Sequence, residues 1–197
     1  TDGQVSENTS GKHGGGIYAA SANLSFSKGI IQKNHSTQSG GGIYFSGTNF
    51  TLAGGQILDN TADFYGGGLC FVDPADGTPS LKAVVSKGDV IGNVAARCGG
   101  AIFMQFEGTL DFSGGNIVGN KAVDGGGVCL QGSLDTQKGP VMTFGNGIIR
   151  NNLAKYDSSY SDVNFTTGNQ YTIGWLNGVG GAVYLENYAS MKFDLSD

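Results

Sequence analysis

Four charged residues in the middle of the chain are the best candidates for catalysis. Glu107, Asp111 and Asp124 carry carboxylates that could serve as general acid and base, and Arg97 could stabilise a developing negative charge. Carboxylates of this kind cleave glycosidic bonds when they line one groove. The repeat described below puts the four residues on different strand elements. We therefore predict that they share no groove and that the chain is not an enzyme.

Histidine and serine motifs add little to this picture. His13 stands before three glycines, an arrangement similar to the oxyanion-binding strip of esterases. No Gly-x-Ser-x-Gly sequence occurs, and His35 is the only other histidine. Later repeats also have unrelated residues in the position of His13, so we assign it no catalytic role. These residues are Ser39, Tyr65, Cys98 and Asp124.

The cysteines and acidic turns predict neither a metal site nor a cofactor. Cys70, Cys98 and Cys129 are odd in number and lack the spacing of metal ligands, so we expect no disulfide framework and no zinc site. Asp73 and Asp76 could bind calcium, but Asp-Pro-Ala-Asp-Gly is equally a turn sequence.

An aromatic-rich insertion is the predicted ligand-binding region. Residues 152–179 interrupt the repeat and contain Tyr156, Tyr160, Tyr171 and Trp175, the only tryptophan. Aromatic side chains on a surface loop provide much of the contact area in binding sites. The alternative is that they pack against the side of the molecule. Two shorter insertions, 72–80 and 132–140, share a corner of the repeat and are expected to lie near each other.

An internal repeat of about 26 residues determines the elements that carry these side chains. The motif Gly-x-(Ile/Val)-x-x-Asn is followed each time by a glycine run and an apolar pair, as in Gly40-Gly41-Gly42-Ile43-Tyr44. In a sixth copy, from Asn146 to Asn151, Asn replaces the first Gly. Since Asn is next to Gly in tolerating positive φ, the first position is predicted to be a corner with positive φ. The other copies begin at Gly3, Gly29, Gly55, Gly88 and Gly115.

Each repeat holds three short apolar segments, because a further one, such as Leu24-Ser25-Phe26, precedes each motif. The segments alternate with period two, as strands do, and Gly or Asn separates them. One repeat cannot bury its apolar faces alone, so the repeats must stack on one another. We predict an all-β fold over residues 1–197: a right-handed parallel β-helix with three strands per coil and six to seven coils.

Stacking places equivalent residues of successive coils above one another. The last residue of each motif is predicted to form an inward ladder in which side-chain amides satisfy backbone carbonyls and each other. The predicted ladder comprises Asn8, Asn34, Asn60, Asn93, Asn120 and Asn151. The second residue of each apolar pair forms an outward stack, which could bind sugars or a partner but which we interpret as covering the sheet. This stack comprises Tyr18, Tyr44, Cys70, Phe103, Cys129 and Tyr184.

Composition excludes two classes of protein. The 197 residues include 36 glycines and only 14% charged residues, with a net charge of −5. The 11 basic residues are scattered, so no patch could follow a nucleic-acid backbone. No apolar run approaches the roughly 20 residues of a membrane-spanning helix. We therefore expect no nucleic-acid partner and no transmembrane segment in this chain.

The two motifs together resemble the repeats of the polymorphic outer-membrane proteins, a family of chlamydial autotransporter adhesins with relatives among surface proteins of other bacteria. Gly99-Gly100-Ala101-Ile102 matches one motif and Ile117-Val118-Gly119-Asn120 the other, although the family usually has Phe where this chain has Ile or Val. The resemblance covers essentially the whole chain. It implies secretion or display on a bacterial cell surface, flanking coils or domains, and a host protein or glycan as partner.

The resemblance thus predicts a non-enzymatic, adhesin-like passenger segment that binds a host surface protein or glycan, or that acts as a stalk. The alternative is a carbohydrate-active enzyme, because polysaccharide lyases and related glycosidases use the same fold. Fold alone does not separate these functions.

Overall fold

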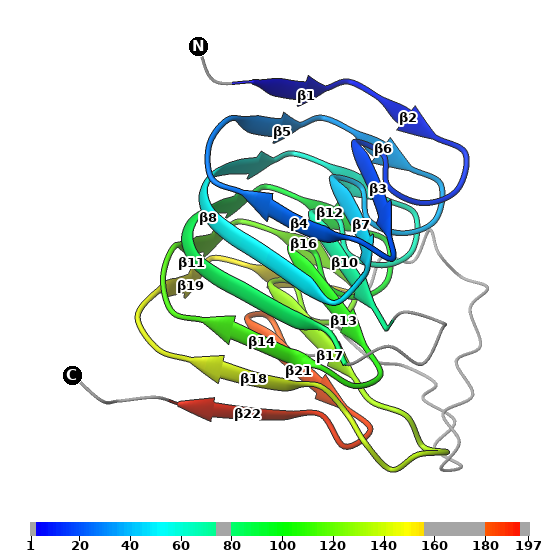
Figure 1. Cartoon of the computed structure of the whole chain (residues 1–197), viewed down its shortest axis with the longest axis vertical. Coiled ribbons are helices and arrows are strands. Elements are labelled where there is room, and N and C mark those ends of the chain that lie inside the picture. The colour runs from blue at the N-terminus through cyan, green and yellow to red at the C-terminus, as the bar shows by residue number, and fades with distance from the viewer. Residues whose placement is uncertain (1–2, 74–79, 156–179, 194–197) are drawn as a thin grey trace.

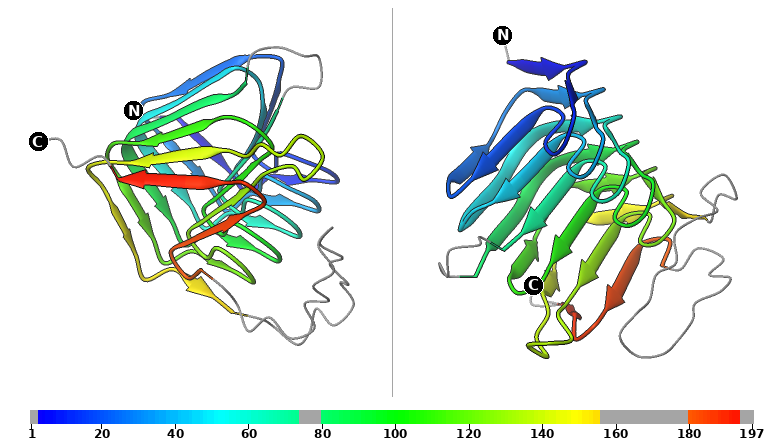
Figure 2. Two further views of the ribbon diagram at one scale, coloured as in Figure 1. Left: turned by 90° about the horizontal axis from the view of Figure 1, so that it is seen from below. Right: turned by 90° about the vertical axis from the view of Figure 1, so that its right-hand side faces the viewer.

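The computed structural model describes residues 3–73, 80–155 and 180–193. Their regular structure consists of 22 strands and no helix. The chain passes through three parallel sheets in turn, so each coil adds a layer to each sheet (Figure 1). Seen along the long axis, successive coils lie over one another (Figure 2, left). The predicted parallel β-helix is confirmed. The described residues contain no helix with the length and hydropathy needed to span a membrane.

Sheet A, the largest, takes two of the predicted apolar segments from each coil. In two central coils these segments join into one ten-residue strand, and elsewhere they remain separate. The strands are β1 (Gln4–Ser6), β4 (Asn23–Phe26), β5 (Ile30–Gln32), β8 (Asn49–Leu58), β11 (Lys82–Ile91), β14 (Thr109–Phe112), β15 (Asn116–Val118), β18 (Val141–Phe144), β19 (Ile148–Arg150) and β22 (Ser190–Phe193).

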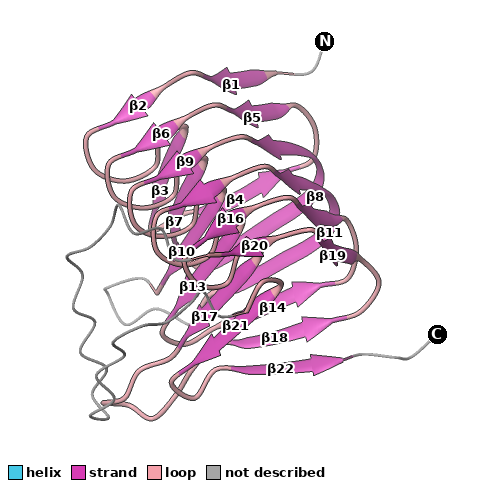
Figure 3. Ribbon diagram, turned by 180° about the vertical axis from the view of Figure 1, so that it is seen from behind, coloured by secondary structure: helices cyan, strands magenta, loops and turns pink. Residues whose placement is uncertain are grey.

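Sheets B and C complete each coil. Sheet B, seen from behind in Figure 3, has two-residue strands that follow the Asn motif: β2 (Thr9–Ser10), β6 (His35–Ser36), β9 (Thr61–Ala62), β12 (Val94–Ala95), β16 (Lys121–Ala122) and β20 (Leu153–Ala154). Sheet C follows the glycine runs: β3 (Ile17–Ala20), β7 (Ile43–Ser46), β10 (Leu69–Val72), β13 (Ile102–Gln105), β17 (Val128–Gln131) and β21 (Val183–Glu186).

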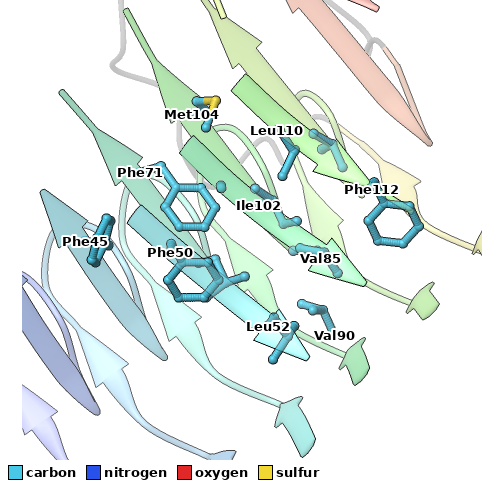
Figure 4. Packing of buried hydrophobic residues seen from close by; sticks show 14 of the residues in the cluster. Phe45, Phe50, Leu52, Phe71, Val85, Val90, Ile102, Met104, Leu110 and Phe112 are labelled. Atoms are coloured by element: carbon cyan, nitrogen blue, oxygen red, sulfur yellow. The ribbon is translucent and has the colours of Figure 1, made fainter. Parts of the chain in front are cut away.

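Inward side chains from the sheets meet in one continuous apolar core. Phe45, Phe50 and Phe71 pack edge to face, with ring centroids 4.9 to 6.2 Å apart (Figure 4). All three are fully buried. Burying a side chain of this size contributes about 1.5–3 kcal/mol, so the repeated inward positions supply much of the stability.

A ladder of asparagines runs through the interior beside this core. The Nδ2 group of Asn93 donates to Oδ1 of Asn120 (3.0 Å) and to the carbonyl of Ile57 (2.9 Å). Its Oδ1 accepts from the backbone N–H and the Nδ2 of Asn60, at 2.9 and 3.0 Å. The same pattern repeats from coil to coil, so each amide satisfies buried polar groups of two neighbouring coils. The ladder comprises Asn8, Asn34, Asn60, Asn93, Asn120 and Asn152.

The last member of the ladder is Asn152, and the prediction of Asn151 was wrong. Asn152 Oδ1 accepts from the N–H and the Nδ2 of Asn120, at 2.9 and 2.8 Å. Since Asn116 pairs with Ile148, the sixth motif begins at Gly147 and not at Asn146. Asn151 instead takes the left-handed position just before the ladder, with φ of 56°. The same position has positive φ in the other coils, at Glu7 (59°), Lys33 (53°), Asp59 (51°), Gly92 (68°) and Gly119 (68°).

The glycines of each run are required by backbone geometry. The first of each run has φ between 56° and 71°. The second lies against the next coil: a Cβ on Gly41 would collide with the carbonyl oxygens of Thr61 and Gly67. The predicted corner at the start of the motif also has positive φ at Gly29 (93°), Gly55 (76°), Gly88 (104°) and Gly115 (93°). It does not have positive φ at Asn146, the replacement from which the corner was predicted. The glycine runs thus set the path of the chain from sheet B into sheet C, whereas the glycines that begin the motif bend the chain within sheet A.

The two shorter insertions meet at one residue, Glu107. Its N–H donates to Oδ2 of Asp73 (2.9 Å), and its carboxylate pairs with Lys138 (3.2 Å). Asp73 belongs to insertion 72–80, of which residues 74–79 lie outside the described residues, and Lys138 belongs to insertion 132–140. Both insertions connect sheet C to sheet A, at the corner that the sequence predicted them to share.

Candidate functional site

The aromatic residues predicted to bind a ligand lie outside the described residues. Tyr156, Tyr160, Tyr171 and Trp175 therefore remain a prediction of the sequence. The described residues that flank this insertion, Lys155 and Gly180, lie between sheets B and C.

The four charged candidates for catalysis do not share a groove. Glu107 pairs with Lys138 in the loop between β13 and β14, whereas Asp111 is exposed on β14 in sheet A. Asp124 lies at the bend before β17, where its Oδ2 is 4.0 Å from the thiol sulfur of Cys98. The guanidinium carbon of Arg97 lies 4.4 Å from the centre of the Phe64 ring, at the bend before β13. Arg97 and Asp124 are neighbours, since the N–H of Asp124 donates to the carbonyl of Arg97 (2.9 Å), but Glu107 and Asp111 lie elsewhere.

The predicted outward stack, which we call the outer row of sheet C, runs in register along the sheet. Its middle members are covered. Cys70, Phe103 and Cys129 are at most 1% exposed, whereas Tyr18, in the first coil, is 59% exposed. The outer row comprises Tyr18, Tyr44, Cys70, Phe103, Cys129 and Tyr184.

The cover comes from the residue just before each glycine run. The positive-φ glycine turns the chain back on itself, so this residue lies over sheet C rather than pointing away. We call these residues the bend row: His13, Ser39, Tyr65, Cys98 and Asp124. In the sequence, the unrelated residues at this position indicate only that His13 belongs to no catalytic motif. Its packing depends on the turn and was not predicted.

Each bend-row residue packs on the outer-row residue of the next coil. His13 stacks on Tyr44, with ring centroids 4.5 Å apart, and Tyr65 stacks on Phe103 at 4.6 Å. Large and small residues alternate between the rows: Tyr65 accompanies Cys70 in one coil, and Cys98 accompanies Phe103 in the next. This complementarity in size lets the two rows interdigitate.

A groove of about 340 Å³ opens between the two rows in the central coils. It lies where the small side chains Ser39 and Cys70 stand near the rings of Tyr44, Tyr65 and Phe103. Gln38 and Phe64, at the bends, also line the groove, as do Val72 and Gln105 at the ends of β10 and β13. The full lining is His13, Gln38, Ser39, Tyr44, Phe64, Tyr65, Cys70, Val72, Phe103 and Gln105.

A side-chain ladder orients one polar group of the groove. Glu186 accepts a hydrogen bond from Nε2 of Gln131 (2.9 Å), so Oε1 of Gln131 faces the other way and accepts from Nε2 of Gln105 (3.2 Å). This leaves Oε1 of Gln105 directed toward the coil of Val72, whose side chain has no donor. Within the described part of the chain, no donor bonds to Oε1 of Gln105.

The ionisable groups of the groove are neutral near pH 7. Burial, with smaller contributions from Cys70 and Tyr18, raises the pKa of Tyr44 to about 12, so its hydroxyl remains a donor. Burial, assisted by the charge of Lys12, lowers the pKa of His13. Nδ1 of His13 is buried and has no hydrogen-bond partner among the described residues. The groove therefore combines aromatic rings with uncharged hydrogen-bonding groups.

The repeat itself matches a known family model. The model of the Chlamydia polymorphic membrane protein repeat matches residues 2–20. These residues contain β1, β2 and β3, one passage of the chain from sheet A through sheet B to sheet C, and the same trio recurs in every later coil. The suspected resemblance is confirmed for this repeat, and the match supports a cell-surface location in general terms. No curated protein and no solved structure matches the chain.

Proposed function

We propose that this chain is a non-enzymatic, adhesin-like passenger segment of a bacterial surface protein, and that it binds a host glycan in the groove of sheet C. The observation that carries the proposal is the chemistry of the groove, in which aromatic rings stand beside an unpaired amide acceptor. Sugars present apolar C–H faces, which pack on aromatic rings, and hydroxyl edges, which need neutral donors and acceptors.

Individual polar groups of the groove fit sugar hydroxyls. Oε1 of Gln105 would accept from one hydroxyl, and the Tyr44 hydroxyl, kept protonated by burial, would donate to another. None of the lining residues is Asp, Glu, Lys or Arg, so the site favours a neutral sugar. The volume of about 340 Å³ is near the lower end of the usual range for small-molecule sites, about 300–1,000 Å³. A short terminal oligosaccharide suits it better than a protein surface.

The placement of the charged residues supports binding rather than catalysis. A lyase or glycosidase needs its carboxylates on both sides of one scissile bond. Here Asp111 is exposed on sheet A, whereas Asp124 lies at a bend beside sheet C. Glu107 is held by Lys138 in a third place. The three carboxylates proposed for the carbohydrate-active alternative therefore do not flank one bond.

Binding of the labelled chain to a panel of neutral and charged glycans, and to epithelial cells, tests the proposal. We expect saturable binding to a neutral glycan, and Gln105→Leu should weaken it about tenfold, since one hydrogen bond is lost. The matched control is Gln32→Leu on sheet A, which should bind normally. A deletion of residues 156–175 tests the site predicted from the sequence.

The outcomes separate the possible roles. Binding that Gln105→Leu reduces and the deletion spares supports the groove. Binding that only the deletion abolishes contradicts the groove and supports the aromatic insertion. No binding by the wild-type chain contradicts the adhesin proposal and supports a stalk. Release of sugar products from the panel would show an enzyme.

A further inference from the structure

Two of the three cysteines lie together on the outer side of sheet C, away from the core. Cys98 is 6% exposed, Cys129 is fully buried, and both belong to one apolar cluster with Phe103 and Tyr184. The glycan-binding proposal does not use this pair. The sequence alone predicts no disulfide framework, because the three cysteines are odd in number.

The register of the two rows brings Cys98 against Cys129. Cys98 is the bend-row residue of one coil, and Cys129 is the outer-row residue of the next. The same relation places the His13 ring 4.5 Å from the Tyr44 ring and the Tyr65 ring 4.6 Å from the Phe103 ring. Cys98 and Cys129 belong to the same buried cluster, and Cys98 is close enough to contribute to the raised pKa of the Cys129 thiol. Both side chains are short, so they meet where larger residues stack in other coils.

Cys70 has a different neighbour and provides an internal control. The bend-row residue that packs on it is Ser39, whose hydroxyl is close enough to the Cys70 thiol to influence its pKa. A coil that holds Phe103 separates Cys70 from Cys129 in the outer row. Among the described residues, Cys98 and Cys129 are therefore neighbours, whereas Cys70 is one coil too far from Cys129 to bond with it.

We propose that Cys98 and Cys129 form a disulfide that joins two adjacent coils when the chain meets a small disulfide oxidant such as oxidised glutathione. A cell-surface location would supply the oxidising surroundings in which protein disulfides persist. The bond would link β17 to the bend that leads into β13, which carries Phe103 and Gln105 of the groove.

The exchange proceeds in two balanced steps. The thiolate of Cys98, the more exposed of the two, attacks the oxidant, releases one glutathione thiol and forms a mixed disulfide. The thiolate of Cys129 then attacks the sulfur of Cys98 and releases the second glutathione. The protein loses two protons and two electrons, and the glutathione disulfide is reduced to two thiols. Burial raises the pKa of Cys129, so the second step is slow in the folded protein.

Peptide mapping of the full chain tests the bond directly. The chain is incubated with oxidised glutathione or with a reductant, alkylated in denaturant, and digested with trypsin without reduction. Trypsin places the three cysteines in separate peptides: residues 34–82, 98–121 and 122–138. We expect 98–121 linked to 122–138, lighter by two hydrogens than the two reduced peptides, with Cys70 alkylated. A bond that closes a loop of about 30 residues should raise Tm by about 5–10 °C over the reduced chain.

Variants confirm the assignment. Cys70→Ser should keep the linked peptide and the rise in Tm, and Cys98→Ser should lose both. If Cys98→Ser does not fold, the peptide map of the oxidised wild-type chain is sufficient to show whether Cys98 and Cys129 are linked. The proposal is overturned if the oxidised chain yields three alkylated cysteines, a bond to Cys70, or glutathione left on Cys98.

Discussion

The inner and outer rows of sheet C come from the same six strands, yet their residues follow different rules. The inner row contains only branched aliphatic residues: Ile17, Ile43, Leu69, Ile102, Val128 and Val183. The outer row mixes tyrosine, cysteine and phenylalanine. This inner row stacks residues of similar size and shape, whereas the second inward row of the same strands, two residues further on, varies in size and includes Phe45, Phe71, Met104 and Leu130. Outside, the bend row compensates for each change in size, so the layers can differ.

This contrast separates what holds the fold together from what can bind a ligand. A regular stack leaves no space between its layers. The groove exists because two small residues, Ser39 and Cys70, interrupt a series of rings. On a solenoid of this kind, the irregular row is therefore the place to look for a function. Substitutions at the regular inward positions and in the irregular outer row should therefore have different effects on stability and binding.

The largest effect is expected inside, at the centre of the asparagine ladder. Asn93→Ala removes the partners of buried groups on Asn60, Asn120 and Ile57. We expect a loss of about 3–5 kcal/mol in the free energy of unfolding, measured by urea denaturation. Asn152→Ala, at the half-exposed end of the ladder, should cost less than half as much. Equal losses at both positions would show that the buried bonds are not the cause.

Two adjacent glycines should differ sharply. A Cβ on Gly67 would collide with the backbone of Val94 and Gly100 in the next coil, so Gly67→Ala should cost about 2–3 kcal/mol. A Cβ on Gly68 would also approach the carbonyl oxygen of Ala101, at 2.8 Å. Because Ala101 and Ala182 occupy the equivalent position in other coils, Gly68→Ala should cost only about 1 kcal/mol. Thermal unfolding of the two variants compares them, and a more harmful Gly68→Ala would contradict the assigned close contact.

In the outer row, the ring stack itself should contribute a moderate amount. Phe103→Leu keeps an apolar side chain but removes the ring that stacks on Tyr65, whose centroid is 4.6 Å away. We expect a loss of about 1 kcal/mol in urea denaturation. Phe106→Leu, at an exposed ring in the next loop, is the control and should be neutral. A neutral Phe103→Leu would mean that the rows touch without stabilising each other.

The smallest effect concerns pH. Because the pKa of His13 is lowered by folding, the unfolded chain binds more protons below about pH 6.5, and stability falls as the pH drops through that value. His13→Gln should reduce the difference in Tm between pH 7.5 and pH 5 by about 1 °C. An unchanged difference would place His13 in water rather than against Tyr44.

The repeat made the β-helix predictable from sequence, because identical spacings must stack in register. Sheet B was harder to foresee, since strands of two residues are too short to show an alternating pattern. The end of the ladder was misplaced because Asn151 and Asn152 are adjacent, and only the pairing of Ile148 with Asn116 selects the second. The pattern could not distinguish an asparagine that makes the turn from one that joins the ladder.

The groove could not be predicted because it depends on a contact between two rows. The sequence shows that Ser39 and Tyr65 occupy equivalent positions, but not that a glycine with positive φ turns them over sheet C. Nor does it show that Glu186 determines which way the Gln105 amide points, through Gln131. These effects arise between coils, so they appear only once the register is known.

The most direct test of the account compares two neighbouring residues of β7, Ile43 and Tyr44. Ile43→Ala removes an inner-row side chain and should cost about 2–4 kcal/mol, while the folded variant binds the selected glycan with unchanged Kd. Tyr44→Ala should cost less stability but raise Kd at least tenfold, since its ring and hydroxyl line the groove. Isothermal titration of both variants against that glycan decides the matter. An unchanged Kd for Tyr44→Ala, or an equal loss of affinity for both, would contradict the division between an inner row that holds the fold and an outer row that binds.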